Sequence, residues 1–98
     1  MPNANYIAGR DLEYKVMKDW NEKGYDCVRA AGSHGKFDVV AFRHDRKPEF
    51  IQCKRVIEKS EAKRLMTEFR SLHVPSTFYH QVMAVKIKGS SEILSTTV

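Results

Sequence analysis

The chain has 98 residues, of which 42% are hydrophobic and 30% charged, so it can form one domain over residues 1–98 with a thin core. No apolar run approaches the about 20 residues that span a bilayer, and the N-terminus lacks the features of a signal peptide, which predicts a cytoplasmic protein. Two cysteines cannot build a disulfide framework, so we expect both thiols to be reduced. The net charge of +5 is concentrated between Arg43 and Arg70, where nine Lys and Arg outnumber five Asp and Glu, which suits either a polyanionic partner or a solvated surface.

The first half of the chain predicts one helix followed by three strands. Residues 7–23 form the helix, with apolar side chains at helical spacing and Gly24 as its C-terminal stop. The expected strands are residues 25–30, 37–43 and 50–54. They are separated by a turn with two glycines at residues 31–36 and by a turn at residues 44–49 that contains Pro48.

The second half predicts a helix and two further strands. Ser60 is the expected N-cap, and Pro75 prevents the helix from continuing. The apolar stripe of this helix consists of Ala62, Leu65, Met66, Phe69 and Leu72. Residues 81–88 form a strand with a period of two, and residues 93–98 a short last strand. The order α-β-β-β-α-β-β predicts an α/β fold with a mixed central sheet flanked by helices.

Two acidic residues stand where carboxylates are unfavourable. Glu13 falls on the apolar face of the first helix, where a carboxylate is costly unless it is paired or binds a ligand. Asp38 lies at the start of an apolar strand, although aspartate is a poor strand former. Each also has an ordinary interpretation: Glu13 as a boundary residue that reaches solvent or a basic partner, and Asp38 as a residue that binds the backbone of the preceding turn.

A polar pair occurs on the third strand. Gln52 and Lys54 project to one face, while Ile51 and Cys53 project to the other. The pair is also compatible with an edge strand that has a polar outer face. If the hairpin brings Asp38 beside the pair, and Glu13 packs near them, the result is a cluster of oxygen ligands beside a lysine. Mg²⁺ prefers oxygen ligands, and phosphodiester hydrolysis uses such a cation to activate water and stabilise the leaving oxygen.

Four motifs in this order resemble the archaeal Holliday-junction resolvases of the PD-(D/E)xK nuclease superfamily. The similarity covers about residues 9–56, with weaker similarity at residues 65–69 and 82–86. The motifs are Gly9-x-x-x-Glu13, Gly24-Tyr25-x-x-Val28-Arg29-Ala30-Ala31-Gly32-Ser33, Phe37-Asp38-Val39-Val40-Ala41 and Ile51-Gln52-Cys53-Lys54.

The resemblance implies a restriction-endonuclease-like αβββαβ core, a homodimer and Mg²⁺-dependent cleavage of branched DNA, with Mn²⁺ as a substitute ion. It assigns the metal to Glu13, Asp38, position 52 and the backbone carbonyl of Cys53. Lys54 would activate water, and Ser33 would lie near the scissile phosphate.

The chain departs from the family at Gln52, where the motif has an acidic residue. A glutamine oxygen can still bind Mg²⁺, but the site loses one negative charge and should bind the cation more weakly. Around the site, basic residues are candidate phosphate contacts, each of which can equally be a solvated surface residue. These residues are Arg10, Arg29, Lys36, Arg43 and Arg55.

Three functions compete on this evidence. The first is a structure-selective nuclease that cuts two strands of a junction as a dimer. The second is a homing-type, phage or viral endonuclease that cuts duplex or damaged DNA with the same core. The third is a DNA-binding module that has lost catalysis, which Gln52 favours. The chain is also shorter than expected for the resolvase family, which affects the dimer surface and junction selectivity more than the chemistry.

Overall fold

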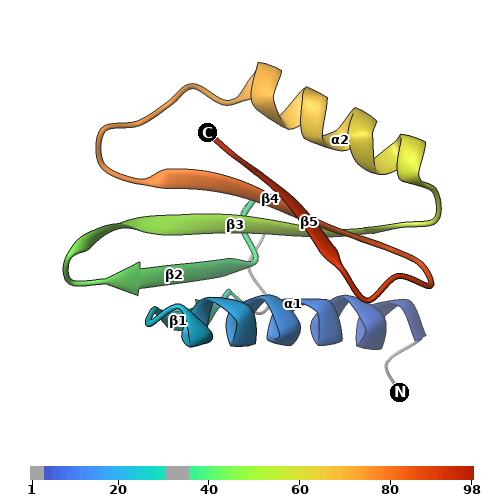
Figure 1. Ribbon diagram of the computed structural model, residues 1–98, viewed down its shortest axis with the longest axis horizontal. Helices are drawn as coiled ribbons and strands as arrows, with labels where there is room; N and C mark the ends of the chain where they lie inside the picture. Colours follow the sequence, from blue (N-terminus) through green and yellow to red (C-terminus); the bar gives the residue numbers. More distant parts are fainter. Residues whose placement is uncertain (1–3, 31–35) are drawn as a thin grey trace.

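The computed structural model describes residues 4–30 and 36–98, and its elements follow the predicted order (Figure 1). The elements are α1 (Ala4–Glu22), β1 (Asp26–Arg29), β2 (Val39–Arg43), β3 (Arg46–Val56), α2 (Lys59–Leu72), β4 (His80–Ile87) and β5 (Ile93–Thr97). Within the described residues, no helix is long and apolar enough to cross a bilayer.

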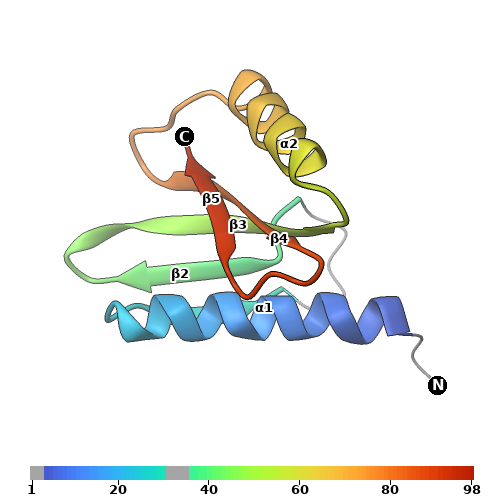
Figure 2. The same cartoon turned by 45° about the vertical axis from the view of Figure 1, so that its right-hand side comes forward.

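The five strands form one mixed sheet in the order β1-β2-β3-β4-β5. β3 and β4 pair in parallel and are connected through α2, whereas the other neighbours pair antiparallel. The two helices lie on opposite faces of the twisted sheet, with α1 along β1 to β3 and α2 above β4 and β5 (Figures 1 and 2). The predicted α/β class, with helices flanking a mixed sheet, is confirmed.

Each helix covers its own hydrophobic cluster, and β4 contributes to both. Val82 and Ala84 join the cluster under α1, whereas Met83 and Val85 join the cluster under α2. Residues 81–85 are therefore all buried, and the predicted in-and-out period of this strand is wrong. A strand covered on both faces has no solvent side and needs no alternation.

The hairpin between β2 and β3 is tighter than predicted. Only His44 and Asp45 form the turn, and β3 already begins at Arg46. Pro48 therefore lies within a strand, although a proline cannot donate a ladder hydrogen bond. It is tolerated because the β2–β3 register is irregular between Ala41 and Arg43, and because β4 pairs with β3 only from Glu49 onward.

The ends of α2 also differ from the prediction. The N-cap is Glu58 rather than Ser60, and the Glu61 carboxylate accepts the N–H of Ile57 at 3.3 Å, which stabilises the first turn. At the other end, Leu72 is 77% exposed and does not belong to the buried stripe. The next residue, His73, is half-buried instead, and its ring stacks on Phe69 with 4.0 Å between centroids.

Candidate active site

Along its second half, β3 has no paired strand on the side of β2 among the described residues. On the β2 side, the regular pairs end at Val39 with Ile51, whereas β4 accompanies β3 as far as Val56. The first half of α1 lies beside this unpaired edge and encloses a pocket of about 300 Å³ with it. The pocket is lined by Gly9, Leu12, Glu13, Cys53, Lys54 and Arg55. Glu13 and Lys54, predicted from distant parts of the chain, thus line the same pocket.

Asp38 lies directly before the first residue of β2, where the pairing of β2 with β3 stops. Its backbone N–H donates to the carbonyl of Ile51 at 2.8 Å, and its carbonyl accepts the N–H of Ala30 at 2.8 Å. Its Oδ2 accepts the N–H of Cys53, also at 2.8 Å. The carboxylate therefore continues the ladder by one bond where the backbone of β2 no longer can. Because odd-numbered residues of β3 direct their backbone groups toward β2, the carbonyl of Cys53 points to the same unpaired edge.

Glu13 is paired with a cation from β1. Its Oε1 accepts the Nε–H of Arg29 at 2.7 Å, and both side chains are only about one-fifth exposed, at 20% and 17%. The Arg29 guanidinium also lies over the ring of Tyr14, 5.1 Å from its centroid. Glu13 thus has the basic partner that its ordinary interpretation allows, and Glu13 itself lines the pocket.

The charges of the two carboxylates affect the pKa of the Cys53 thiol. Burial, and then the negative charges of Asp38 and Glu13, raise the pKa of Cys53 to about 12. Two carboxylates from different parts of the chain therefore disfavour the thiolate form of Cys53. The pKa of Cys27 is also raised, by burial and by the charge of Asp26. Both cysteines are free, half-buried thiols, as predicted.

Gln52 occupies a different position from its neighbours. Ile51 and Cys53 pack into the cluster under α1, so the alternation of the strand directs both Gln52 and Lys54 toward the α2 side, opposite Met83 and Val85 in the β3–β4 register. Asp38 bonds to the residues on either side of Gln52, through its backbone N–H to the Ile51 carbonyl and through its carboxylate to the Cys53 amide. Gln52 is therefore adjacent to Asp38 but does not line the pocket of Glu13 and Lys54.

The donor set is suited in chemistry, though not in its present arrangement, to a hard cation. Two carboxylates, an amide and a backbone carbonyl are oxygen ligands of the kind that Mg²⁺ prefers. However, no three His, Cys, Asp or Glu side chains lie close enough to hold a metal ion among residues 4–30 and 36–98. The Arg29 guanidinium also occupies Oε1 of Glu13. A bound cation would have to share or displace this contact.

The predicted phosphate-binding residues are distributed over both ends of the molecule. Arg55 lines the pocket. Lys36 is exposed two residues before Asp38, and Arg10 lies on α1 near the pocket, with its Nε 4.0 Å from Asp11 Oδ1.

Arg43 lies at the opposite end of β2. There it forms two hydrogen bonds to the Asp45 carboxylate, at 2.9 and 3.0 Å. Ser33 is outside the described residues.

Sequence reasoning did not anticipate that Arg29 pairs with Glu13. The two residues are 16 positions apart on different elements, and no local spacing indicates their contact. It also missed Lys15 and Lys86, which lie with Arg55 on a neighbouring pocket. Their common position depends on how α1 crosses β3 and β4, which the sequence does not reveal.

Comparison with known proteins gives a structural match alone. No protein-family model and no curated protein matches the sequence significantly. Among solved structures, the chain is similar to the 1.6 Å structure of Archaeoglobus fulgidus Hjc, a Holliday junction resolvase from an archaeal hyperthermophile. The fold is that of an archaeal Holliday junction resolvase. The TM-score is 0.55 at 20% identity, and the match covers 85% of this chain and 67% of Hjc.

Proposed function

We propose that this protein is a metal-dependent DNA endonuclease that hydrolyses phosphodiester bonds in branched DNA such as Holliday junctions. The observation that carries the proposal is the convergence of Glu13 and Lys54 on one pocket at the open edge of β3, with Asp38 bonded to the intervening Cys53 amide. The shared fold with Hjc makes a junction the first substrate to test.

Each residue has a role that follows from its position. Glu13, Asp38, Gln52 and the Cys53 carbonyl would hold a divalent cation, Mg²⁺ or Mn²⁺, which would supply Lewis-acid chemistry at the scissile phosphate. Lys54 is exposed and is one of the residues that line the pocket, and its ammonium would orient the attacking water or offset negative charge that develops on the phosphate oxygens. Asp38 also anchors the end of β2 through the Cys53 amide, which keeps the open edge in register.

Cleavage assays test this proposal. A synthetic four-way junction, a linear duplex and a single strand are each incubated with the wild type and with Asp38→Ala, with and without Mg²⁺ or Mn²⁺. We expect metal-dependent nicking of the junction by the wild type and little by the variant. Equal cutting of junction and duplex would replace the resolvase by a duplex endonuclease of the same chemistry. Cutting without added metal, or equally by Asp38→Ala, would contradict the proposal.

A DNA-binding module without catalysis is the second candidate. Two observations favour it: Gln52 lacks the charge of the family's acidic residue, and Arg29 neutralises Glu13 at 2.7 Å. Both reduce the attraction of the pocket for a cation. This candidate predicts junction or duplex binding with no cutting under any metal condition.

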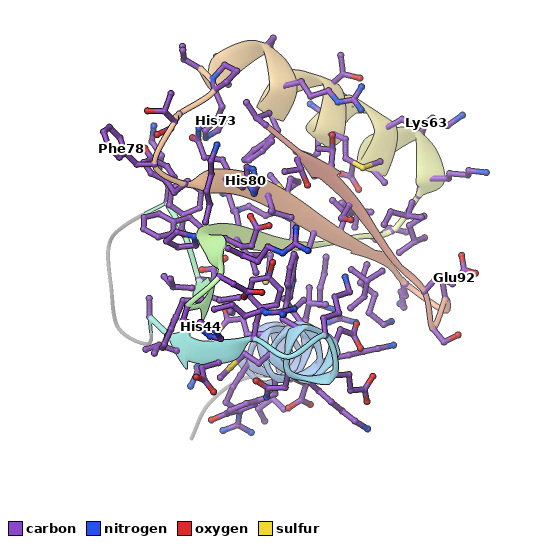
Figure 3. The ribbon with its side chains drawn as sticks, turned by 60° about the vertical axis from the view of Figure 1, so that its left-hand side comes forward. His44, Lys63, His73, Phe78, His80 and Glu92 are labelled. Carbon is purple, nitrogen blue, oxygen red and sulfur yellow. The ribbon has the colours of Figure 1, made fainter. Side chains whose placement is uncertain are left out.

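A homodimer is part of the first proposal, because two sites related by a two-fold axis would make paired incisions in a two-fold junction. Phe78, in the loop between α2 and β4, is 81% exposed and projects away from the sheet (Figure 3). Sedimentation analysis of the wild type, with Phe78→Ser as a comparison, measures whether the protein dimerises and whether this side chain contributes.

A further inference from the structure

A second pocket adjoins the candidate active site. It lies between the first half of α1 and the C-terminal ends of β3 and β4, and its volume is about 240 Å³. The lining residues are Ala8, Asp11, Leu12, Lys15, Arg55 and Lys86. Leu12 and Arg55 also line the pocket of Glu13 and Lys54, so the two hollows share a wall.

Three cations from three elements meet at this second pocket. Lys15 comes from α1, Arg55 from β3 and Lys86 from β4. Arg55 and Lys86 are direct partners in the parallel β3–β4 register, so their side chains emerge side by side on the α1 face. Like charges in neighbouring positions of a sheet are destabilising. An arrangement of this kind is favourable where an anion binds between the cations.

The balancing negative charge within the pocket is small. Asp11 is the lone carboxylate among the lining residues, and its side chain is 66% exposed beside Arg10. The third cation is held in place, because the Lys15 ammonium donates a hydrogen bond to the Ser91 carbonyl in the turn between β4 and β5. Lys15 and Lys86 are both half-buried, so their stems pack against the protein while the ammonium groups border the hollow.

We propose that Lys15, Arg55 and Lys86 form a binding site for a DNA backbone phosphate next to the one at Glu13 and Lys54. This inference rests on the proposed nuclease function and specifies where the substrate strand runs. Arg55 lies on the wall between the two pockets, and its planar guanidinium can bind phosphate oxygens with two donors. The strand would pass from the open edge of β3 across α1 toward the end of β4.

The test measures DNA binding in the absence of metal. Fluorescence anisotropy of a labelled four-way junction, in EDTA and over a range of salt concentrations, gives the affinity and the slope of log K against log salt. Lys15→Gln, Arg55→Gln and Lys86→Gln should each lower the affinity several-fold. Each should also reduce the magnitude of the slope by about 0.9, the value for one phosphate contact on duplex DNA. Asp11→Asn should raise the affinity, because it removes the negative charge in the pocket.

Lys63→Gln is the matched control. Lys63 projects into solvent from the outer side of α2, across the sheet from α1 (Figure 3), and its replacement removes the same charge without touching the pocket. Circular dichroism melts verify that all variants fold. The inference is overturned if Lys15→Gln and Lys86→Gln behave like Lys63→Gln, or if folded variants lose affinity with an unchanged slope.

Cleavage of the same junction by the wild type with Mg²⁺ separates this inference from the proposed function. Binding with the expected changes in slope but no cutting would support the phosphate site and reject the nuclease. Cutting with unchanged slopes in the three variants would support the nuclease and reject the phosphate site.

Discussion

The carboxylates along the two halves of β3 differ in their surroundings. In the first half, from Glu49 to Ile51, β3 lies between β2 and β4, and Glu49 is only 7% exposed. Glu49 is bound by the ring of His80 from β4, with 3.1 Å between Nδ1 and Oε1. In the second half, β2 has ended, and Glu13 and Asp38 approach the strand from other elements.

This difference indicates that strand pairing decides which acid residues are accessible to a ligand. Glu49 is enclosed by a complete sheet and has a partner on the adjacent strand, so its role is structural. Beyond Ile51, the missing strand exposes the edge of β3, and a carboxylate from α1 and a lysine from β3 line the resulting pocket. The length of β2 therefore sets the position of the candidate site.

Removing the open-edge carboxylate should have the largest effect. Asp38→Ala should reduce metal-dependent cleavage at least about 100-fold, as for the loss of one group that stabilises a transition state. Glu49→Gln, which keeps an acceptor for His80, should leave the cleavage rate within about twofold because it lies in the closed half. Single-turnover cleavage of a four-way junction measures both. Similar losses in the two variants would contradict the division of β3 into a structural and a functional half.

Restoring the absent charge should have the next largest effect. Gln52→Glu places a carboxylate between Ile51 and Cys53, the two residues to which Asp38 bonds. A unit charge about 4 Å from a cation is worth about 4 kcal/mol per unit charge at an effective dielectric near 20, and less where solvent screens it, so we expect about tenfold tighter Mg²⁺ binding. Isothermal titration calorimetry measures the affinity. Thr67→Glu, on the exposed side of α2, adds the same charge elsewhere and should have no effect.

Removing Arg29, the partner of Glu13, should also tighten Mg²⁺ binding, but by a smaller factor. Arg29→Met leaves Glu13 without its guanidinium partner and should tighten Mg²⁺ binding a few-fold in the same titration. Arg43→Met breaks a comparable ion pair, with Asp45, at the far end of β2. An equal change in the two variants would indicate a general effect of net charge, and weaker binding by Arg29→Met would show that the arginine supports the site.

The smallest effect concerns the dependence of stability on pH, through the thiol of Cys53. The pKa of Cys53 is raised to about 12, so the unfolded chain, with a thiol pKa near 9.0, releases this proton first as the pH rises. The stability contributed by the neutral thiol is thus complete below pH 9 and is lost between about pH 9 and 12. Denaturant unfolding of the wild type and Cys53→Ala should therefore show a smaller decline over this window in the variant. An identical decline would place Cys53 in an ordinary environment.

The sequence predicted the order of elements because hydrophobic periodicity and turn residues are local signals. The sequence also drew attention to Glu13, Asp38 and Lys54, since each is a charged residue in an apolar pattern; their roles stay predictions. The length of β3 was missed because Pro48 normally ends a strand, and its tolerance depends on the irregular β2–β3 register and on where β4 begins to pair.

Contacts between distant elements account for the remaining errors. The period of β4 failed because whether a strand is covered on both faces depends on two helices far away in sequence. The pairing of Arg29 with Glu13, and the grouping of Lys15 with Lys86, depend on the packing of α1 against the sheet. Nothing within a window of ten residues carries such information.

The contribution of β4 to both hydrophobic clusters also governs how the chain can fold. Its side chains complete both hydrophobic clusters, and its parallel partner β3 is joined to it only through α2. A nascent chain that has emerged as far as Leu72 has both helices and the β2–β3 hairpin, yet it has neither finished core. Because the long connection must close before these contacts form, stable structure should appear late and cooperatively, once residues 80–87 leave the ribosome.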